Sequence, residues 1–221
     1  MLIASSAILL GVSGVSAQST SAASAPAAAP AAAKSTAPKV KIVTSMGDIV
    51  IELNPDKAPK TVENFLQYVK DKHYDGTIFH RVMDGFMIQG GGFNADMQQK
   101  PVRPPIPLES SNGLKNDRGS IAMARTNVPN SATAQFFINV VNNNNLNAPL
   151  PDGYGYAVFG KVISGMETVD KIRQVATGNK GPHGNVPQTP ITITSATLEN
   201  NHGQPPSPTR HHRLRLAHHR A

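Results

Sequence analysis

Short apolar segments separated by turn residues are the feature that most constrains the fold of this chain. Its 221 residues include 18 glycines and 18 prolines, a composition that suits short strands joined by turns. Apolar residues alternate at Val40 and Ile42, and again at Ile49 and Ile51, on either side of a turn at Met46-Gly47. Six further strands are expected, at residues 78–82, 86–89, 120–124, 135–141, 156–162 and 191–198. We therefore predict a mainly β fold, a closed eight-stranded antiparallel β-barrel capped by two helices.

The two predicted helices have clear signals. Ala58-Pro59 opens the first, because proline is tolerated in the first turn of a helix. Apolar residues then recur at helical spacing, at Val62, Phe65, Leu66 and Val69. The second helix is expected over Met166–Arg173. Residues 40–199 are of a size common for one domain with one core.

Both ends of the chain differ in composition from the predicted domain. A short apolar run over residues 2–12, followed by small residues, predicts a signal peptide over 1–17 and a periplasmic or secreted protein. No Lys or Arg precedes this run, so an uncleaved anchor or a start further upstream is the alternative. Residues 18–39 are predicted to be a disordered Ala/Ser/Pro-rich linker. Residues 200–221 are predicted to be a disordered basic tail. The apolar run is too short to span a membrane, so no stable membrane insertion is expected.

The net charge of +7 is concentrated at the two ends. Residues 200–221 carry four arginines and no acidic residue, and residues 1–39 carry two lysines and no acidic residue. The predicted domain is left with 15 basic and 14 acidic residues. A protein that binds nucleic acid is expected to carry its basic surface on the folded part. We therefore expect no nucleic-acid partner.

The chain has no cysteine, which excludes disulfides, thiolate metal sites and thiol catalysis. Paired histidines at 211–212 and 218–219 raise the alternative of a metal-handling tail. Isolated pairs in a disordered segment make a poor metal site, so we predict no metal and no cofactor.

The run FHRVMDGFMIQGGGF, residues 79–93, is the most informative for function. It places one fixed cation, Arg81, near two apolar side chains, Phe86 and Met87, and an amide, Gln89. Three glycines follow and allow the backbone to turn sharply or to approach a partner closely. The run contains neither a nucleophile with a base nor a metal cage. A rigid donor beside an apolar pocket suits rotation about a prolyl amide, which breaks no bond and moves no proton.

This run and three further segments resemble the cyclophilin family of peptidyl-prolyl cis-trans isomerases, and its bacterial periplasmic members in particular. The further segments are GSIAMARTN (119–127), ATAQFFINV (132–140) and GYAVFGKVISGMETVDKI (155–172). The resemblance implies an isomerase that acts on proline-containing unfolded or partly folded polypeptides. It assigns to Arg81 the donation of a hydrogen bond to the prolyl nitrogen. The alternative for Arg81 is an ion pair with Glu63 or Asp84.

The resemblance also implies the remaining site residues. Arg81 and Gln89 form the expected catalytic group, and Gln135 offers a second amide. Ala124, Arg125 and Thr126 match a segment that binds the residue before proline through its backbone. Relatives often have Asn at the position of Arg125, so no side-chain role is expected for this residue. The proline slot is expected to be lined by Phe86, Met87, Phe137 and Leu146 and bordered by Tyr156.

Several neighbouring residues are expected not to take part. Phe79 and Phe136 should lie in the core, because alternation along a strand turns them away from Arg81 and Phe137. His80 is expected to be a hydrogen-bonded structural histidine. The Asn142–Asn145 run is expected to be a polar loop, and Asn145 stands where many eukaryotic relatives carry a Trp that contacts cyclosporin. We predict a monomer. A binding module or holdase without turnover is the competing hypothesis.

Overall fold

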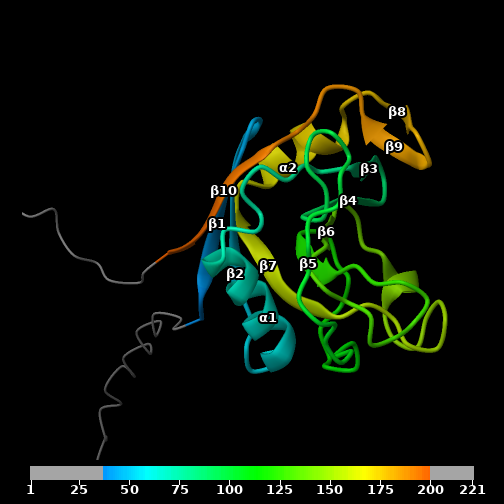
Figure 1. The fold of residues 1–221 in the computed structure, drawn as a ribbon. Coiled ribbons are helices and arrows are strands. Elements are labelled where there is room, and N and C mark those ends of the chain that lie inside the picture. The colour runs from blue at the N-terminus through cyan, green and yellow to red at the C-terminus, as the bar shows by residue number, and fades with distance from the viewer. Residues whose placement is uncertain (1–36, 200–221) are drawn as a thin grey trace, which may run out of the picture. The chain divides into compact units, whose positions relative to one another are not determined.

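The computed structural model describes residues 37–199, so the predicted signal peptide, all but the last three residues of the linker, and the tail lie outside the described residues. Eight strands form one antiparallel sheet in the order β10-β1-β2-β7-β5-β6-β4-β3 (Figure 1). The strands are β1 (Lys39–Thr44), β2 (Gly47–Leu53), β3 (Arg81–Met83), β4 (Met87–Gly90), β5 (Ser120–Met123), β6 (Phe136–Asn139), β7 (Val158–Ser164) and β10 (Ile193–Glu199). The prediction of eight antiparallel strands is confirmed.

The prediction of a closed barrel is wrong, because the sheet is an open half-barrel with β3 and β10 at its two edges. The segments that precede these strands do meet: Ile78 bridges Thr192, and the Phe79 amide donates to the Ile191 carbonyl at 3.0 Å. β3 begins only at Arg81, after that contact, and has three residues. β10 instead pairs with β1 over nearly its whole length. The edges therefore touch at one place and do not form a continuous ladder.

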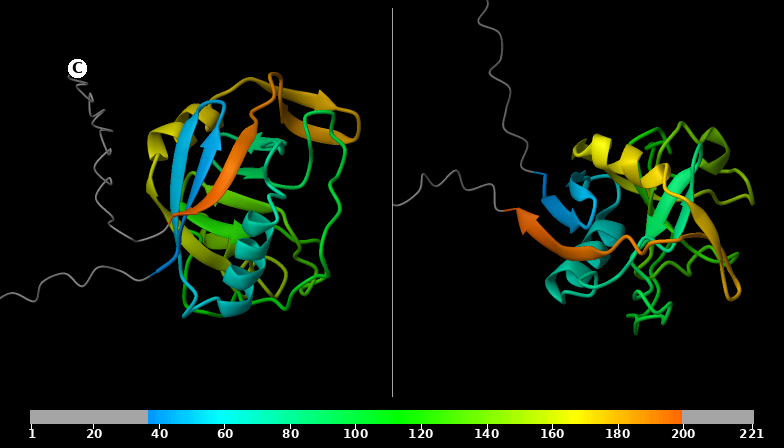
Figure 2. Two further views of the ribbon diagram at one scale, coloured as in Figure 1. Left: turned by 60° about the vertical axis from the view of Figure 1, so that its left-hand side comes forward. Right: turned by 90° about the horizontal axis from the view of Figure 1, so that it is seen from above.

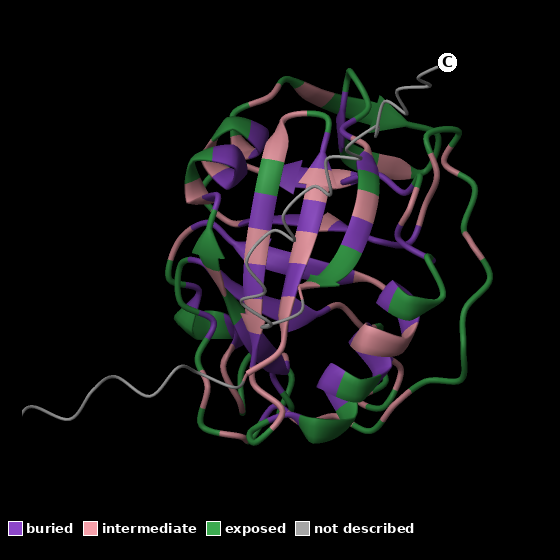
Figure 3. Ribbon diagram, turned by 90° about the vertical axis from the view of Figure 1, so that its left-hand side faces the viewer, coloured by how far each residue is buried: buried purple, intermediate pink, exposed green. Residues whose placement is uncertain are grey.

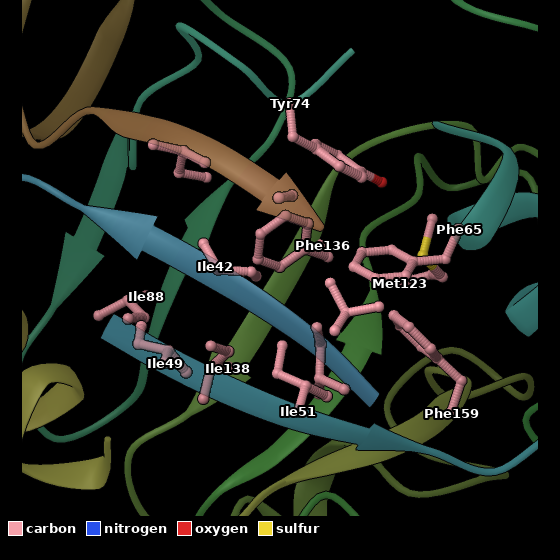
Figure 4. Packing of buried hydrophobic residues seen from close by; sticks show 14 of the residues in the cluster. Ile42, Ile49, Ile51, Phe65, Tyr74, Ile88, Met123, Phe136, Ile138 and Phe159 are labelled. Carbon is pink, nitrogen blue, oxygen red and sulfur yellow. The ribbon is translucent and has the colours of Figure 1, made fainter. Parts of the chain in front are cut away.

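The inner face of the sheet is filled as the alternation predicted. Val40, Ile42, Ile49 and Ile51 are fully buried, and buried and less buried residues alternate along the strands (Figure 3). Phe65, Tyr74, Phe136 and Phe159 meet in the middle of the core (Figure 4). The Phe65 and Phe136 rings lie edge to face with centroids 5.8 Å apart, a favourable aromatic geometry. Phe79 is also fully buried, so the core assignment of Phe79 and Phe136 is confirmed.

Helices α1 (Pro59–Lys70) and α2 (Met166–Arg173) lie at opposite ends of the sheet (Figures 1 and 2). Both occur where the sequence predicted them. α1 has no capping side chain of its own, and Glu109 supplies one from the long connection between β4 and β5. One carboxylate oxygen of Glu109 accepts hydrogen bonds from the Thr61 amide and hydroxyl, both at 2.6 Å. The connection that carries Glu109 runs along the outside of the domain (Figure 2).

Three short elements were not predicted: the hairpin β8 (Thr177–Lys180) and β9 (His183–Pro187), and a 3-10 turn, η1 (Asn144–Leu146). The hairpin is largely exposed and polar, so it lacks the apolar alternation on which strand prediction depends. Within residues 37–199, no helix is long and apolar enough to cross a membrane. The same residues contain no group of three or more His, Asp or Glu side chains placed to hold a metal ion.

Candidate active site

A cavity of about 150 Å³ opens on the outer face of β4 and β6. Its walls contain nine of the eleven residues that the sequence predicted for the site: Arg81, Phe86, Met87, Gln89, Ala124, Arg125, Phe137, Leu146 and Tyr156. The other two, Thr126 and Gln135, do not line it. A cavity of this volume accommodates a ring the size of benzene, so a prolyl ring fits.

The register of three strands places the polar and apolar parts of the cavity side by side. Arg81 on β3 is paired with Gln89 on β4, and Gln89 is paired with Phe137 on β6. Residues directly opposite each other in a sheet point to the same face. The intervening positions Val82, Ile88 and Ile138 point the other way and are buried in the main core. One face of these short strands therefore builds the site while the other anchors it.

The apolar part of the cavity is a small cluster separate from the main core. Met87, Phe137 and Leu146 are between 2 and 7 % exposed, and Phe86 and Tyr156 pack against them as partly buried neighbours. The Phe137 and Tyr156 rings lie edge to face, with centroids 5.7 Å apart. The cluster forms an apolar slot that opens beside Arg81.

The Arg81 side chain makes no hydrogen bond or ion pair with any other residue in the described part of the chain. The alternative of an ion pair with Glu63 or Asp84 is not realised: Asp84 pairs with Arg173, and within residues 37–199 Glu63 forms no ion pair. Arg81 is half-buried at the edge of the cavity. Its guanidinium keeps its full set of donors for a ligand.

Gln89 and Gln135 form one amide pair. Gln89 Nε2 donates to Gln135 Oε1 at 3.0 Å, which leaves the Gln89 oxygen and the Gln135 amino group with donor and acceptor capacity. Gly92 makes room for Gln135, since a Cβ there would lie 2.5 Å from Gln135 Cγ. Gly91 has a positive φ of 86°, and a Cβ there would lie 2.8 Å from the Tyr74 ring. The glycine run therefore provides the close approach that the sequence indicated.

Arg125 has a side-chain role that the sequence analysis did not expect. Its side chain is 1 % exposed and forms an ion pair with Asp152 at 2.8 Å. It also donates to the Gly155 carbonyl, from Nε at 3.1 Å and Nη2 at 2.6 Å. Its guanidinium carbon lies 4.4 Å from the centre of the Tyr156 ring, a cation–π geometry. Arg125 thus holds the loop that carries Tyr156. Its partner Asp152 lies 27 residues further along the chain, so no local sequence pattern predicts the contact.

Asp152 is held ionised by the same contacts. Desolvation raises the pKa of Asp152, but hydrogen bonds from Arg125 and from the Tyr154 and Gly155 amides together lower it by more. The pKa therefore lies below its ordinary value. Thr126 lies in the adjacent turn, where its amide and its hydroxyl both donate to Ser131 Oγ at 2.9 Å.

His80 is buried, but the prediction that it is hydrogen-bonded is wrong. Its Nδ1 has no hydrogen-bond partner among residues 37–199, and the ring packs against Phe93 with centroids 4.7 Å apart. Desolvation, with smaller contributions from the charges of His183 and Arg81, lowers the pKa of His80 to about 4. The imidazole is therefore neutral at physiological pH and belongs to the packing of the domain.

Comparison with known proteins agrees with this geometry. The family model described as "Cyclophilin type peptidyl-prolyl cis-trans isomerase/CLD" matches residues 39–198. A peptidyl-prolyl cis-trans isomerase of Streptomyces antibioticus is 58 % identical over 161 residues, which cover 72 % of this chain and 97 % of that protein. Peptidyl-prolyl cis-trans isomerase B of Escherichia coli is 56 % identical over 157 residues, covering 70 % of this chain and 96 % of that protein.

A solved structure supports the same assignment. The crystal structure of a cyclophilin-type peptidyl-prolyl cis-trans isomerase of Cryptosporidium parvum matches with a TM-score of 0.62 and 30 % identity, covering 75 % of this chain and 99 % of that one. The chain therefore belongs to the cyclophilin family, as its motifs indicated. It is a peptidyl-prolyl cis-trans isomerase that acts on proline-containing polypeptides.

Proposed function

We propose that the cavity beside Arg81 is the proline site of this isomerase, and that Arg81 drives the rotation by donating a hydrogen bond to the prolyl nitrogen. The observation that carries the proposal is an unpaired guanidinium at the edge of an apolar slot. A cation whose side chain has no hydrogen-bond or ion-pair partner among residues 37–199 lies beside a ring-sized apolar cavity. Such a site is suited to a ligand that presents an apolar ring and an acceptor together.

The chemistry of the prolyl amide explains why such a donor is effective. Rotation is slow because the nitrogen shares its lone pair with the carbonyl, which gives a barrier of about 18–20 kcal/mol. In the twisted amide the lone pair is localised on nitrogen and accepts a hydrogen bond. A guanidinium is always charged and rigid, so it donates without first being protonated. Because this hydrogen bond forms only in the twisted state, it lowers the barrier and does not merely tighten binding.

The neighbouring groups suit the rest of the substrate. In this proposal the prolyl ring enters the slot formed by Met87, Phe137 and Leu146, and the Gln89–Gln135 pair holds the substrate backbone. The residue before proline lies along Ala124–Thr126. A related structure from Cryptosporidium parvum, 31 % identical, was solved in the presence of the dipeptide Ala-Pro. That small ligand has the ring and the preceding residue that the proposed site requires.

Removal of one wall of the slot tests the proposal. Phe137→Ala should raise KM for an Xaa-Pro peptide about tenfold or more, because the ring loses an apolar contact in both the ground state and the transition state. Val128→Ala is the matched control, since Val128 is 60 % exposed and lies outside the cavity. Equal KM values for the two variants would place the proline site elsewhere and would refute the proposal.

We also propose that the protein acts outside the cytoplasm as a monomer. The predicted signal peptide supports export. Residues 40–199 carry almost no net charge, which argues against a nucleic-acid partner. Cell fractionation tests the location, and sedimentation tests the oligomeric state. Recovery of the protein in the cytoplasmic fraction alone, or as a stable dimer, would contradict these assignments.

A further inference from the structure

A chain of buried asparagines lies beneath the proposed proline site. Asn116 and Asn139 are fully buried, and Asn143 is 6 % exposed. Asn143 belongs to the run that the sequence analysis expected to be a polar loop; it does lie in the loop before η1, but its side chain is buried. A buried side-chain amide is unfavourable unless its donors and acceptors are satisfied, so the partners of these three residues are informative.

The three amides are linked head to tail. Asn143 Nδ2 donates to Asn139 Oδ1 at 2.7 Å, and Asn139 Nδ2 donates to Asn116 Oδ1 at 3.1 Å. Asn139 Nδ2 also donates to Ser120 Oγ at 2.8 Å. Each amide therefore fixes the orientation of the next. A fully satisfied buried network of this kind rigidifies its surroundings.

The two ends of this chain hold the backbone of three residues that line the cavity. At one end, Asn143 Nδ2 donates to the Phe86 carbonyl at 2.8 Å. At the other end, Asn116 Nδ2 donates to the Leu146 carbonyl at 3.2 Å and the Tyr156 carbonyl at 3.4 Å. Phe86, Leu146 and Tyr156 all line the cavity.

These three walls come from segments that no strand ladder joins. Phe86 lies in the turn between β3 and β4, Leu146 ends η1, and Tyr156 precedes β7. Backbone bonds hold these walls in part: the Tyr156 amide donates to the Leu146 carbonyl at 2.9 Å, and the Val140 amide donates to the Phe86 carbonyl at 3.1 Å. The asparagine chain adds one buried network that reaches all three walls. We infer that Asn116, Asn139 and Asn143 are positioning residues that set the width of the proline slot. This inference rests on the proposed use of the cavity as the proline site.

The predicted signature is a change in KM rather than in kcat. The slot contacts the prolyl ring in the ground state and in the transition state, whereas the Arg81 hydrogen bond forms in the transition state. Loss of uniform binding raises KM and leaves kcat nearly unchanged. Asn116→Ala removes the asparagine bond to two of the three carbonyls and leaves the Leu146 carbonyl with only the Tyr156 amide as donor. It should raise KM about tenfold, with kcat within about threefold of the wild type.

Asn143→Ala is the milder variant, because the Phe86 carbonyl keeps a hydrogen bond from the Val140 amide at 3.1 Å. It decides the question if Asn116→Ala does not fold. Asn64→Ala is the matched control. Asn64 is also a buried asparagine, 7 % exposed, and its Nδ2 donates to the Thr133 carbonyl at 2.7 Å, but it does not line the cavity. It loses a buried amide and stability but should keep KM within about twofold of the wild type.

Initial rates over a range of Xaa-Pro peptide concentrations separate the outcomes, at a temperature where circular dichroism shows each variant folded. A raised KM in Asn116→Ala or Asn143→Ala, but not in Asn64→Ala, supports the positioning role. KM values that match the control overturn it. Arg81→Ala in the same series reports on the donor separately. If Arg81→Ala keeps its kcat while Asn116→Ala raises KM, the donor mechanism fails and the positioning role stands.

Discussion

Arg125→Ala is expected to damage both stability and the shape of the proline slot. Arg125 stacks on the Tyr156 ring at 4.4 Å and donates twice to the Gly155 carbonyl. A cation–π contact is worth about 0.5–2 kcal/mol, and a hydrogen bond from a charged donor about 1.5–3 kcal/mol. Because these contacts share one side chain and are not additive, we expect a total loss of about 2–4 kcal/mol.

That loss should lower Tm by about 5–15 °C for a domain of this size. The activity should fall as well, because Tyr156 loses the surface that holds its ring against Phe137. We expect kcat/KM to fall about tenfold at a temperature where the variant is folded. Thermal unfolding and a protease-coupled isomerisation assay on an Xaa-Pro peptide measure the two effects.

Arg125→Lys is the matched variant, because it keeps the charge but loses the planar fork that stacks and donates in two directions. It should recover less than about half of the lost stability. If Arg125→Ala unfolds within about 2 °C of the wild type and keeps its rate within about twofold, the reasoning that Arg125 fixes Tyr156 is refuted.

Three further predictions concern single residues. The pKa of His80 is lowered from 6.5 to about 4 in the folded protein, so between these two pH values the unfolded state binds a proton that the folded state does not. The free energy of unfolding should therefore decrease as the pH falls from about 6.5 to about 4. Denaturant unfolding should show about 2 kcal/mol less stability near pH 5 than near neutrality, and His80→Phe should remove most of this difference; an unchanged slope would contradict the assignment. Glu109→Ala should cost about 1 kcal/mol through the lost cap on α1, and Glu109→Gln less, whereas equal losses would show that the cap is not the cause. Asn145→Trp should tighten cyclosporin inhibition about 30-fold with little change in peptide turnover, and no gain in an inhibition titration would show that this exposed position is not the one that relatives use.

The regular part of the fold could be predicted from local patterns. The hairpin of β1 and β2 follows from strict alternation around Met46-Gly47, and α1 follows from its proline and apolar stripe. Closure of the barrel could not be predicted in this way. Whether β3 and β10 form a ladder depends on where two distant segments diverge after the contact of Ile78 with Thr192.

The site residues divide in the same manner. Arg81, Gln89 and Phe137 were identified because they lie in motifs, and the strand register then brings them to one face. The roles of Arg125 and of the three buried asparagines were missed, since their partners lie far along the chain. A run of asparagines resembles an exposed loop until tertiary structure buries one of them, here Asn143.

The most direct test of the account is the isomerisation rate of Arg81→Ala beside Arg81→Lys. The Arg81 side chain makes no hydrogen bond or ion pair with another described residue, so its removal should leave the fold intact and change the reaction alone. We expect Arg81→Ala to lower kcat/KM by about 10²–10³-fold, the scale for loss of one preorganised donor. Arg81→Lys should restore little, because a point charge does not reproduce the guanidinium fork. A rate above about half of the wild type in Arg81→Ala would contradict donation to the prolyl nitrogen as the source of catalysis.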